Sequence, residues 1–431
     1  MVKFQQETTS YFVLILPLSF LIFTALFTFS SNNPNILLLT NTRNTISTSP
    51  ADLSGRRNTS AAIMTSRDDR VTRECDIFSG EWVPDPSGPH YTNETCWAIH
   101  EHQNCMKYGR PDSGFLKWRW KPEGCELPLL DPLRFLTLLR GKSMAFVGDS
   151  VARNQMQSLI CLLSRAEYPV IISSSPDQRF VHWRYPTYNF TLAAFWSPYL
   201  VRSEEADLDG PTHNGLFNLY LDEFDEQWTS QIDLFDYVII SAGHWFFRPL
   251  VFYENRQVVG CYECLAKNVT DLTRNYGYRN VFRTAFRAIN SRVNYRGVTF
   301  LRTFAPSHFE GGLWNTGGRC NRTRPFRSDE IHLRGAQLNL YGIQVEEFRR
   351  AEEVGRRRGL RYRLLNVTQA TLLRPDGHPT VYGHRPEDRV TLYNDCIHWC
   401  LPGPIDSWND FLLEMLETEL RGILHEEKRS R

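Results

Sequence analysis

Residue types that together can carry out acyl transfer occur in two short stretches of the chain. Ser150 follows an apolar run in FVGDSVARNQ, residues 146–155, and Asp395 precedes His398 by three positions in YNDCIHWC, residues 393–400. A serine hydroxyl becomes a nucleophile when a histidine accepts its proton and a carboxylate orients that histidine. We therefore take Ser150, His398 and Asp395 as candidate nucleophile, base and orienting residue. The alternative is that Ser150 only caps the helix that follows it.

The position of Ser150 between two expected elements suits this chemistry. The apolar stretch SMAFVG, residues 143–148, predicts a short buried strand, and residues 150–165 predict a helix with one apolar face. In an open parallel sheet, ligands bind at the carboxyl ends of the strands, where a helix N-terminus presents free N–H groups. Gly148 permits a sharp turn between strand and helix. The N–H of Ser150 can then stabilise an oxyanion.

Three other histidines compete with His398 or can add to its site. His244 in SAGHWF and His308 in APSHFEGG follow expected strands, so each is a candidate for acceptor binding or for a structural role. Asp376 and His378 in PDGHP form a rival Asp–His pair. The Pro-Gly turn chemistry of that stretch predicts an ordinary exposed loop.

From residue 129 onward, strands and helices are expected to alternate. Strands are expected in residues 143–148, 235–243, 297–306 and 361–368, and helices in residues 131–142, 150–165, 280–293 and 332–359, the last as one helix or two. This alternation is typical of a doubly wound parallel sheet. The predicted fold class is therefore α/β.

The N-terminal part of the chain is expected to form an anchor, a stem and a small subdomain. Residues 11–30 carry no charge and are long enough for a transmembrane helix, which we interpret as an uncleaved signal anchor rather than a cleaved signal peptide. Residues 1–10 would then be a cytosolic tail and residues 31–74 a flexible stem. Residues 75–128 hold four cysteines among turn residues, which predicts a disulfide-rich subdomain before a catalytic domain at 129–431.

Cysteines and glycosylation sequons indicate an oxidising, lumenal compartment. The chain has ten cysteines, and an even number predicts up to five disulfides, whose pairing does not follow from spacing alone. Cys261 and Cys264 have zinc-like spacing without a second such pair, so we expect no metal. The net charge of +1 gives no reason to expect a nucleic-acid partner. Candidate N-glycosylation sites are Asn58, Asn93, Asn189, Asn268, Asn321 and Asn366.

Several long stretches, in order, resemble one family. CDIFSGEWV, FVGDSVARNQMQSL, TFAPSHFEGGLWNTGGRC and DCIHWCLPGPIDSWND are similar to motifs of the plant trichome-birefringence-like proteins, and their Gly-Asp-Ser and Asp-x-x-His blocks resemble those of GDSL/SGNH esterases. The resemblance runs from about Cys75 to the C-terminal helix. It implies an SGNH-hydrolase-like fold, a Ser150–His398–Asp395 triad and a polysaccharide O-acetyltransferase. It also implies a single-pass type II protein of the Golgi membrane with its catalytic domain in the lumen.

The resemblance leaves the oxyanion donors open. Esterases of this type use a glycine and an asparagine besides the nucleophile, whereas SAGHWFF here supplies Gly243 and no asparagine after it. Arg153 and Asn154 of the serine motif lie one helical turn from Ser150 and can contribute to the oxyanion site instead. The candidate oxyanion or acyl-binding residues are Gly148, Asp149, Arg153, Asn154 and Gly243.

The acceptor and the donor are implied only by the resemblance. CWAIHEHQNCMKYGRPDSGFLKWRWKP looks most like members that acetylate galactosyl side chains of xyloglucan. Xylan, mannan or pectin acetylation and a polysaccharide acetyl esterase with the same triad are the alternatives. No bound cofactor is expected, and the donor would be acetyl-CoA or an intermediate acetyl carrier. Acceptor-binding candidates are His244, Trp245, His308, Trp314 and Trp399.

For the cysteines we hypothesise that the N-terminal subdomain is joined both internally and to the esterase-like domain. Cys396 and Cys400 bracket His398, so disulfides at both positions would hold the proposed base on a rigid loop. The hypothetical pairs are Cys75–Cys125, Cys96–Cys161, Cys105–Cys400, Cys320–Cys396 and Cys261–Cys264.

Overall fold

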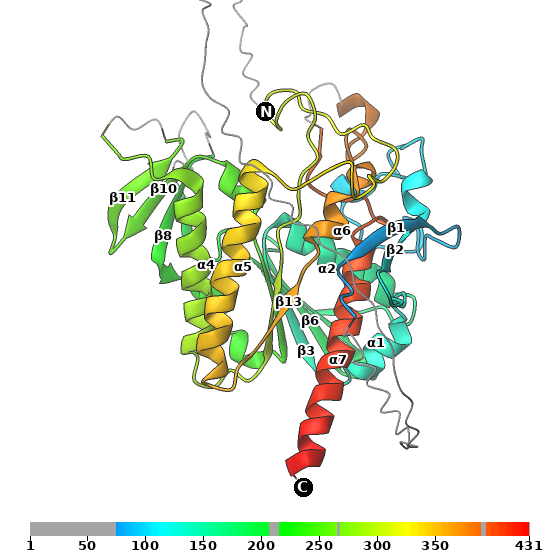
Figure 1. Ribbon diagram of the computed structural model, residues 1–431, viewed down its shortest axis with the longest axis horizontal. Helices are drawn as coiled ribbons and strands as arrows, with labels where there is room; N and C mark the ends of the chain where they lie inside the picture. The colour runs from blue at the N-terminus through cyan, green and yellow to red at the C-terminus, as the bar shows by residue number, and fades with distance from the viewer. Residues whose placement is uncertain (1–74, 207–214, 265–267, 389–393, 431) are drawn as a thin grey trace, which may run out of the picture. The chain divides into compact units, whose positions relative to one another are not determined.

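The computed structural model of the chain describes residues 75–430 except 207–214, 265–267 and 389–393 (Figure 1). The expected cytosolic tail, transmembrane span and stem lie outside these residues, as does Asn58. In the part of the chain that is described, no helix combines the length and the apolar character needed to cross a membrane.

The main sheet has seven strands in the order β13-β12-β9-β3-β6-β5-β4. The five strands from β13 to β6 are parallel to one another, whereas β5 and β4 are antiparallel to their neighbours. The strands are β3 Ser143–Gly148, β4 Val170–Ser174, β5 Phe180–Tyr185, β6 Phe190–Trp196, β9 Tyr237–Ser241, β12 Val298–Arg302 and β13 Arg361–Leu365. The doubly wound parallel expectation is therefore correct for five strands and wrong at one edge. Only a few residues join β4 to β5 and β5 to β6, and such short connections permit antiparallel pairing alone.

Two smaller sheets were not expected from the sequence. One has four strands in the order β11-β10-β8-β7, and the other pairs β1 with β2. Their bounds are β1 Gly80–Pro84, β2 Trp118–Pro122, β7 Val201–Glu205, β8 Phe217–Phe224, β10 Leu250–Glu254 and β11 Gln257–Tyr262. The resulting fold is mixed α/β.

Helices cover both faces of the main sheet (Figure 1). Met144 and Phe146 of β3 pack toward α1, α2 and α7, and Ala145 and Val147 toward α4 and α5, because successive residues of a strand point to opposite faces. This explains why SMAFVG is apolar throughout. The helices are α1 Pro132–Leu138, α2 Ser150–Leu163, α3 Glu226–Thr229, α4 Thr273–Ser291, α5 Gly335–Arg356, α6 Thr368–Leu372 and α7 Asp406–Ser430. Residues 332–359 thus contain one long helix.

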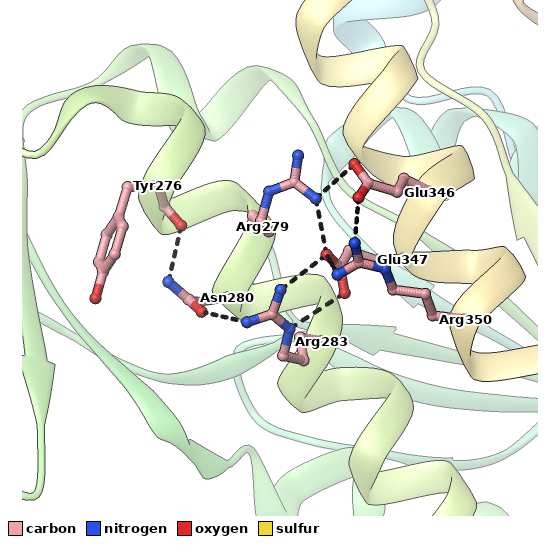
Figure 2. A network of polar contacts seen from close by, with 7 residues as sticks. All are labelled: Tyr276, Arg279, Asn280, Arg283, Glu346, Glu347 and Arg350. Atoms are coloured by element: carbon pink, nitrogen blue, oxygen red, sulfur yellow. Dashed lines mark hydrogen bonds and ion pairs between the residues drawn. The ribbon is translucent and has the colours of Figure 1, made fainter. Parts of the chain in front are cut away.

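An arginine cluster joins α4 to α5. Arg279 and Arg283 of α4 and Arg350 of α5 surround the buried carboxylate of Glu347, with Nη–Oε1 distances of 2.9, 3.0 and 3.3 Å (Figure 2). Glu346 also accepts from Arg279 at 2.6 Å. A buried carboxylate needs such partners, since the charge would otherwise be poorly solvated. The cluster fixes the helix pair on the face of the sheet opposite α2.

The N-terminal segment shares the core of the esterase-like part. Trp82, Tyr91 and Trp120 belong to the same apolar cluster as α2 and α7. Five disulfides are present, and they are the five pairs of the hypothesis: Cys75–Cys125, Cys96–Cys161, Cys105–Cys400, Cys261–Cys264 and Cys320–Cys396. Two of them cross from the N-terminal segment to α2 and to the segment that carries His398.

Two carboxylates, half-buried Asp406 and buried Asp410, lie one turn apart on α7. Asp410 accepts the N–H of Leu130 at 2.7 Å, and burial raises the pKa of its carboxyl to about 7. Asp406 accepts from Tyr91 Oη at 2.7 Å and from Ser158 Oγ at 2.5 Å, and burial raises its pKa to about 6. Both side chains join α7 to other segments at the cost of burying an ionisable group.

Asp410→Asn should become progressively more stable than the wild type as pH rises. The folded pKa of about 7 exceeds the unfolded one, so the contribution of Asp410 is complete below about pH 4 and is lost as pH rises through 7. The amide keeps an oxygen for the Leu130 N–H. The difference in free energy of unfolding should grow by roughly 3 kcal/mol between pH 4 and 7 and then stay level. Urea unfolding with intact disulfides measures it, and a difference that does not change with pH would refute the assignment.

Candidate active site

Ser150, His398 and Asp395 form one hydrogen-bonded chain. The Nε2 atom of His398 lies 2.6 Å from Ser150 Oγ, and its Nδ1 atom lies 2.8 Å from Asp395 Oδ2. A carboxylate only accepts hydrogen bonds, so Nδ1 carries the proton and Nε2 accepts from the serine hydroxyl. The other oxygen of Asp395 accepts the N–H groups of Ile397 and His398 at 3.0 and 2.9 Å. This arrangement can draw a proton from Ser150.

The strand-to-helix turn places Ser150 at the carboxyl end of β3. The next parallel strand along the chain, β6, lies on one side of β3, and β9, the parallel strand after it, lies on the other. This reversal of direction creates the crevice in which doubly wound sheets bind ligands. A side chain at position 148 would not fit, because its Cβ would lie 1.7 Å from the carbonyl oxygen of Ser241. Gly148 therefore brings β9 close to the start of α2.

Asp149 caps α2 and leaves one N–H free beside the nucleophile. Its Oδ1 accepts the N–H groups of Val151 and Ala152 at 3.0 and 3.3 Å, and its backbone carbonyl accepts that of Arg153. Of the first four N–H groups of the helix, only that of Ser150 has no partner among the described residues. Asp149 is thus the helix cap, and Ser150 is the first helical residue.

The charges of the chain stabilise a protonated His398. Burial lowers the pKa of the His398 ring, but the Asp395 carboxylate more than offsets this, and the net shift is upward from the ordinary value of 6.5. Burial likewise raises the pKa of Asp395, yet His398 and the two backbone N–H groups together hold it well below its usual range. Asp395 therefore stays ionised while the imidazole gains and loses a proton.

Contacts from several segments hold residues 395–401 in place. Asp395 pairs with Thr380 through two backbone hydrogen bonds of 2.9 Å, and Cys396 accepts the N–H of His308 at 3.1 Å. The side-chain amide of Asn154 accepts the N–H of Trp399 at 2.8 Å and donates to its carbonyl at 3.3 Å. Disulfides at positions 396 and 400 complete the anchoring. The backbone is therefore fixed on both sides of His398, by contacts to residues 395 and 396 before it and to residues 399 and 400 after it.

Asp395→Asn tests the electrostatic part of this arrangement. Without the carboxylate, the pKa of His398 should fall, since the imidazolium loses the charge that stabilises it. A base acts in its neutral form, so the rate at which a fluorophosphonate probe labels Ser150 should rise with pH through the pKa of His398. The midpoint should move to lower pH, and the maximal rate should fall by roughly 10³–10⁴-fold. Asp329→Asn on the surface is the control, and an unmoved midpoint would contradict the prediction.

Three of the five oxyanion candidates are engaged elsewhere. The N–H of Gly243 donates to Asp149 Oδ2 at 2.9 Å, so it is not available to an oxyanion. Asp149 itself only accepts hydrogen bonds, and the amide of Asn154 is buried against Trp399. These assignments are corrected: Asp149 positions Gly243 and α2, and Asn154 positions the base loop. The sequence could not show this, because the two partners lie 94 and 245 residues away.

Arg153, which lines a neighbouring cavity, and the N–H of Ser150, which has no partner among the described residues, remain as candidate oxyanion donors. Arg153 makes no ion pair among the described residues, and its guanidinium lies 4.8 Å from the ring centre of Trp196. Burial lowers the pKa of the Arg153 guanidinium from its ordinary value, an effect that Asp149 opposes, so the group is partly desolvated. Gly148 has no side chain and therefore allows β9 to lie close to the start of α2, which is its role at the site.

The acceptor candidates divide into surface and core residues. Trp399 is 1% exposed and His308 7% exposed, so neither can contact a polysaccharide, and both assignments are wrong. His244 is half-buried and hydrogen-bonded to the Ala305 carbonyl at 2.8 Å. Trp245 packs edge-to-face on Trp196. Trp314, exposed by 43%, lies on a separate loop.

The expectation for PDGHP is also wrong, since Asp376 and His378 are both fully buried. Arg110 donates to the carbonyl oxygens of both residues at 2.5 and 2.8 Å, and Arg374 pairs with the Asp376 carboxylate at 2.8 Å. Pro and Gly in this stretch form a 3₁₀ turn as their chemistry suggests, but the N-terminal segment covers it. Turn chemistry predicts local shape and carries no information about what packs over it.

A cavity of about 480 Å³ lies at the start of α2, lined by the residues on either side of Ser150 in the sequence but by neither Ser150 nor His398. Gly148, Asp149 and Arg153 line it on the catalytic side. Trp97 and His100 from the N-terminal segment line it as well, together with Trp196 at the end of β6. The sequence analysis chose acceptor candidates next to the serine and histidine motifs and therefore did not identify Trp97, His100 or Trp196. Trp97 and His100 lie in CWAIH, one of the stretches that carries the family resemblance. The cavity thus needs both the N-terminal segment and the sheet.

The asparagines of the described sequons differ in accessibility. Asn189, Asn268 and Asn321 are exposed and Asn93 is half-buried. Asn366 uses its amide internally, with Oδ1 accepting from Thr303 Oγ1 at 3.2 Å and Nδ2 donating to Tyr341 Oη at 3.3 Å. A glycan on Nδ2 would break the second bond, so Asn366 is the poorest of these candidates.

The fold and the hydrogen-bonded chain define a class of protein: an α/β protein with an acyl-transfer arrangement of the GDSL/SGNH type. Family models agree. Residues 127–415 match the GDSL/SGNH-like acyl-esterase family found in Pmr5 and Cas1p, and residues 73–126 match the PMR5 N-terminal domain.

The chain belongs to the trichome-birefringence-like branch of this family. It is 60% identical over 372 residues to "Protein trichome birefringence-like 19" of Arabidopsis thaliana, which covers 86% of each chain. It is 47% identical over 344 residues to "Xyloglucan O-acetyltransferase 4" of Populus trichocarpa, covering 80% of this chain and 81% of that protein. Identity to "xyloglucan O-acetyltransferase 2" of Arabidopsis thaliana is 42% over 349 residues, covering 80% and 84%.

Proposed function

We propose that the protein is a polysaccharide O-acetyltransferase that carries the acetyl group on Ser150. The observation that carries this proposal is the chain of hydrogen bonds from Ser150 Oγ through His398 to Asp395, at 2.6 and 2.8 Å. Relatives named as xyloglucan O-acetyltransferases share the family and most of the chain length. Xyloglucan, through its galactosyl side chains, is the acceptor we propose.

In the proposed first half-reaction, His398 Nε2 takes the hydroxyl proton while Ser150 Oγ attacks the acetyl carbonyl of the donor. The bond from the acetyl carbon to the donor breaks, and His398 returns the proton to the departing group. Acetyl-Ser150 remains. The N–H of Ser150 and the guanidinium of Arg153 stabilise the negative charge on the carbonyl oxygen.

In the second half-reaction, a sugar hydroxyl attacks acetyl-Ser150. His398 accepts the hydroxyl proton and passes it to Ser150 Oγ as the ester bond to the serine breaks. Water can replace the sugar, so transfer requires that a bound acceptor occupy the cavity. Trp97 and Trp196, which line it, offer aromatic faces to a sugar ring, and His100 and Arg153 offer polar groups to hydroxyls.

The donor and the location of the enzyme are also proposals. Acetyl-CoA or an intermediate acetyl carrier would supply the acetyl group as a substrate, with no bound cofactor. A single transmembrane helix at residues 11–30 would hold the protein in the Golgi membrane with the catalytic part in the lumen. The five disulfides suit such an oxidising compartment.

Ser150→Ala should abolish acetyl transfer and leave acceptor binding intact. The full chain is incubated with acetyl-CoA and a galactosylated xyloglucan oligosaccharide, with xylan and mannan oligosaccharides in parallel. Mass spectrometry should show one added acetyl group on the xyloglucan product, and the rate should fall at least about 10³-fold in the variant. Ser164→Ala, at the C-cap of the same helix, is the matched control. Free acetate without any acetylated sugar would show an esterase instead, and full activity of Ser150→Ala would refute the acetyl-serine route.

Arg153→Met tests the proposed oxyanion contact. Methionine retains most of the length and loses the charge, so stability should change little, whereas acetylation of Ser150 should slow by roughly 10²-fold. Quenched-flow mass spectrometry of the Ser150 peptide measures the acetylation rate. Arg179→Met, at the far end of the same cavity, is the control. Equal rates in the two variants would remove Arg153 from the oxyanion site.

A further inference from the structure

Two histidines that the proposed mechanism does not use lie directly behind the base. His308 follows β12, and His378 follows the 3₁₀ turn Pro375–Gly377. His308 Nδ1 lies 2.7 Å from His378 Nε2. At the ends of the pair, His308 Nε2 lies 2.9 Å from the Leu372 carbonyl oxygen, and His378 Nδ1 lies 2.6 Å from the His398 carbonyl oxygen. One line of contacts therefore connects Leu372 to the backbone of His398.

The three contacts require three protons on two rings. Carbonyl oxygens only accept hydrogen bonds, so His308 Nε2 and His378 Nδ1 must each carry a proton. The contact between the rings needs one more proton, on either nitrogen. Two neutral imidazoles hold two protons in total. The geometry is satisfied completely only when the pair carries one extra proton and a single positive charge.

The surroundings on balance oppose this charge, and the hydrogen-bond geometry of the pair favours it. Burial lowers the pKa of His308 to about 4 and that of His378 further, and each ring disfavours a charge on the other. The carbonyls of Leu372 and His398 act in the opposite direction. The charged groups that face the two rings are Glu310, Arg322 and Asp376 around His308, and Arg110 and Asp395 around His378. Arg110 and Arg374 are themselves paired, with Asp112 and Asp376.

We propose that His308 and His378 are a positioning pair for the base, and that they hold the His398 carbonyl through a chain of three hydrogen bonds carrying three protons. The proposal rests on the proposed role of His398 as base. His378 also packs on the ring of Trp399, with centroids 4.2 Å apart. The pair therefore holds the carbonyl of the peptide between His398 and Trp399, while Asn154 holds the N–H of that peptide and the carbonyl of the next one.

This position predicts an effect on chemistry rather than on binding. The ring of His398 reaches Ser150 Oγ only when its backbone is fixed, because the side chain can otherwise rotate into the crevice. Neither histidine lines the cavity beside Ser150. Losing the pair should therefore lower kcat and leave the KM for the acceptor unchanged.

The matched variants His378→Asn and His378→Leu separate positioning from packing. An asparagine amide nitrogen can take the place of Nδ1 and donate to the His398 carbonyl, whereas leucine has similar size and no donor. Fluorophosphonate labelling of Ser150 in the full chain should slow by roughly 10–100-fold in His378→Leu and by at most about threefold in His378→Asn. Thermal unfolding of both variants shows whether they are equally folded. Equal labelling rates in the two variants would overturn the proposal.

The proton count has its own readout. In the full chain labelled with ¹⁵N-histidine, the signals that His378→Leu removes or shifts identify the pair. At the pH of fastest labelling, three of their four ring nitrogens should be bonded to protons, and two protonated nitrogens would overturn the proposal. Neither measurement uses an acetyl donor or a polysaccharide. Failure of acetyl transfer, by contrast, would refute the proposed function and leave these results unchanged.

Discussion

The hydrogen bond between Ser150 Oγ and His398 Nε2 joins residues 248 positions apart, and much of the structure serves to maintain it. A side-chain contact of this kind contributes little free energy by itself, so both ends must be held by other interactions. Asp149 and Gly148 fix the serine at the start of α2. Disulfides at Cys396 and Cys400 fix the loop of the histidine. The nucleophile is thus held by local backbone geometry, and the base by contacts from distant segments.

The two carboxylates nearest to His398, those of Asp395 and Asp149, have different hydrogen-bond partners and therefore different effects on the site. Asp395 faces the imidazole and raises the pKa of His398, whereas Asp149, which is also close, spends its oxygens on backbone N–H groups. The use of the Gly243 N–H by Asp149 removes one donor from the oxyanion site. Arg153, which lines the cavity and is partly desolvated, is the cation we propose for that oxyanion site.

The N-terminal segment, residues 75–128, is part of the structure around the candidate active site. Its Trp97 and His100 line the cavity, Arg110 covers the turn that carries His378, and Cys105 is bonded to Cys400. This explains why the Asp376–His378 pair is buried although its Pro-Gly sequence suggests an exposed loop. Trp399 and His308 are core residues although they adjoin functional motifs, because His378 packs against both of them. The segment that covers the turn lies far away from it in the sequence.

The sequence by itself determined four of the seven strands of the main sheet, β3, β9, β12 and β13, the turn at Gly148 and the residues of the Ser150–His398–Asp395 hydrogen-bonded chain, whereas β4, β5 and β6 were not predicted. Apolar runs, a glycine and an Asp-x-x-His spacing act over a few residues, and their physical meaning is local. The antiparallel edge of the sheet, the four-stranded second sheet and the partners of Gly243 and Asn154 were decided only in the tertiary structure. The pairing of hydrogen-bond donors with acceptors depends on how segments far apart in the sequence pack together, and so does the burial of a turn. A local sequence pattern contains no information about either.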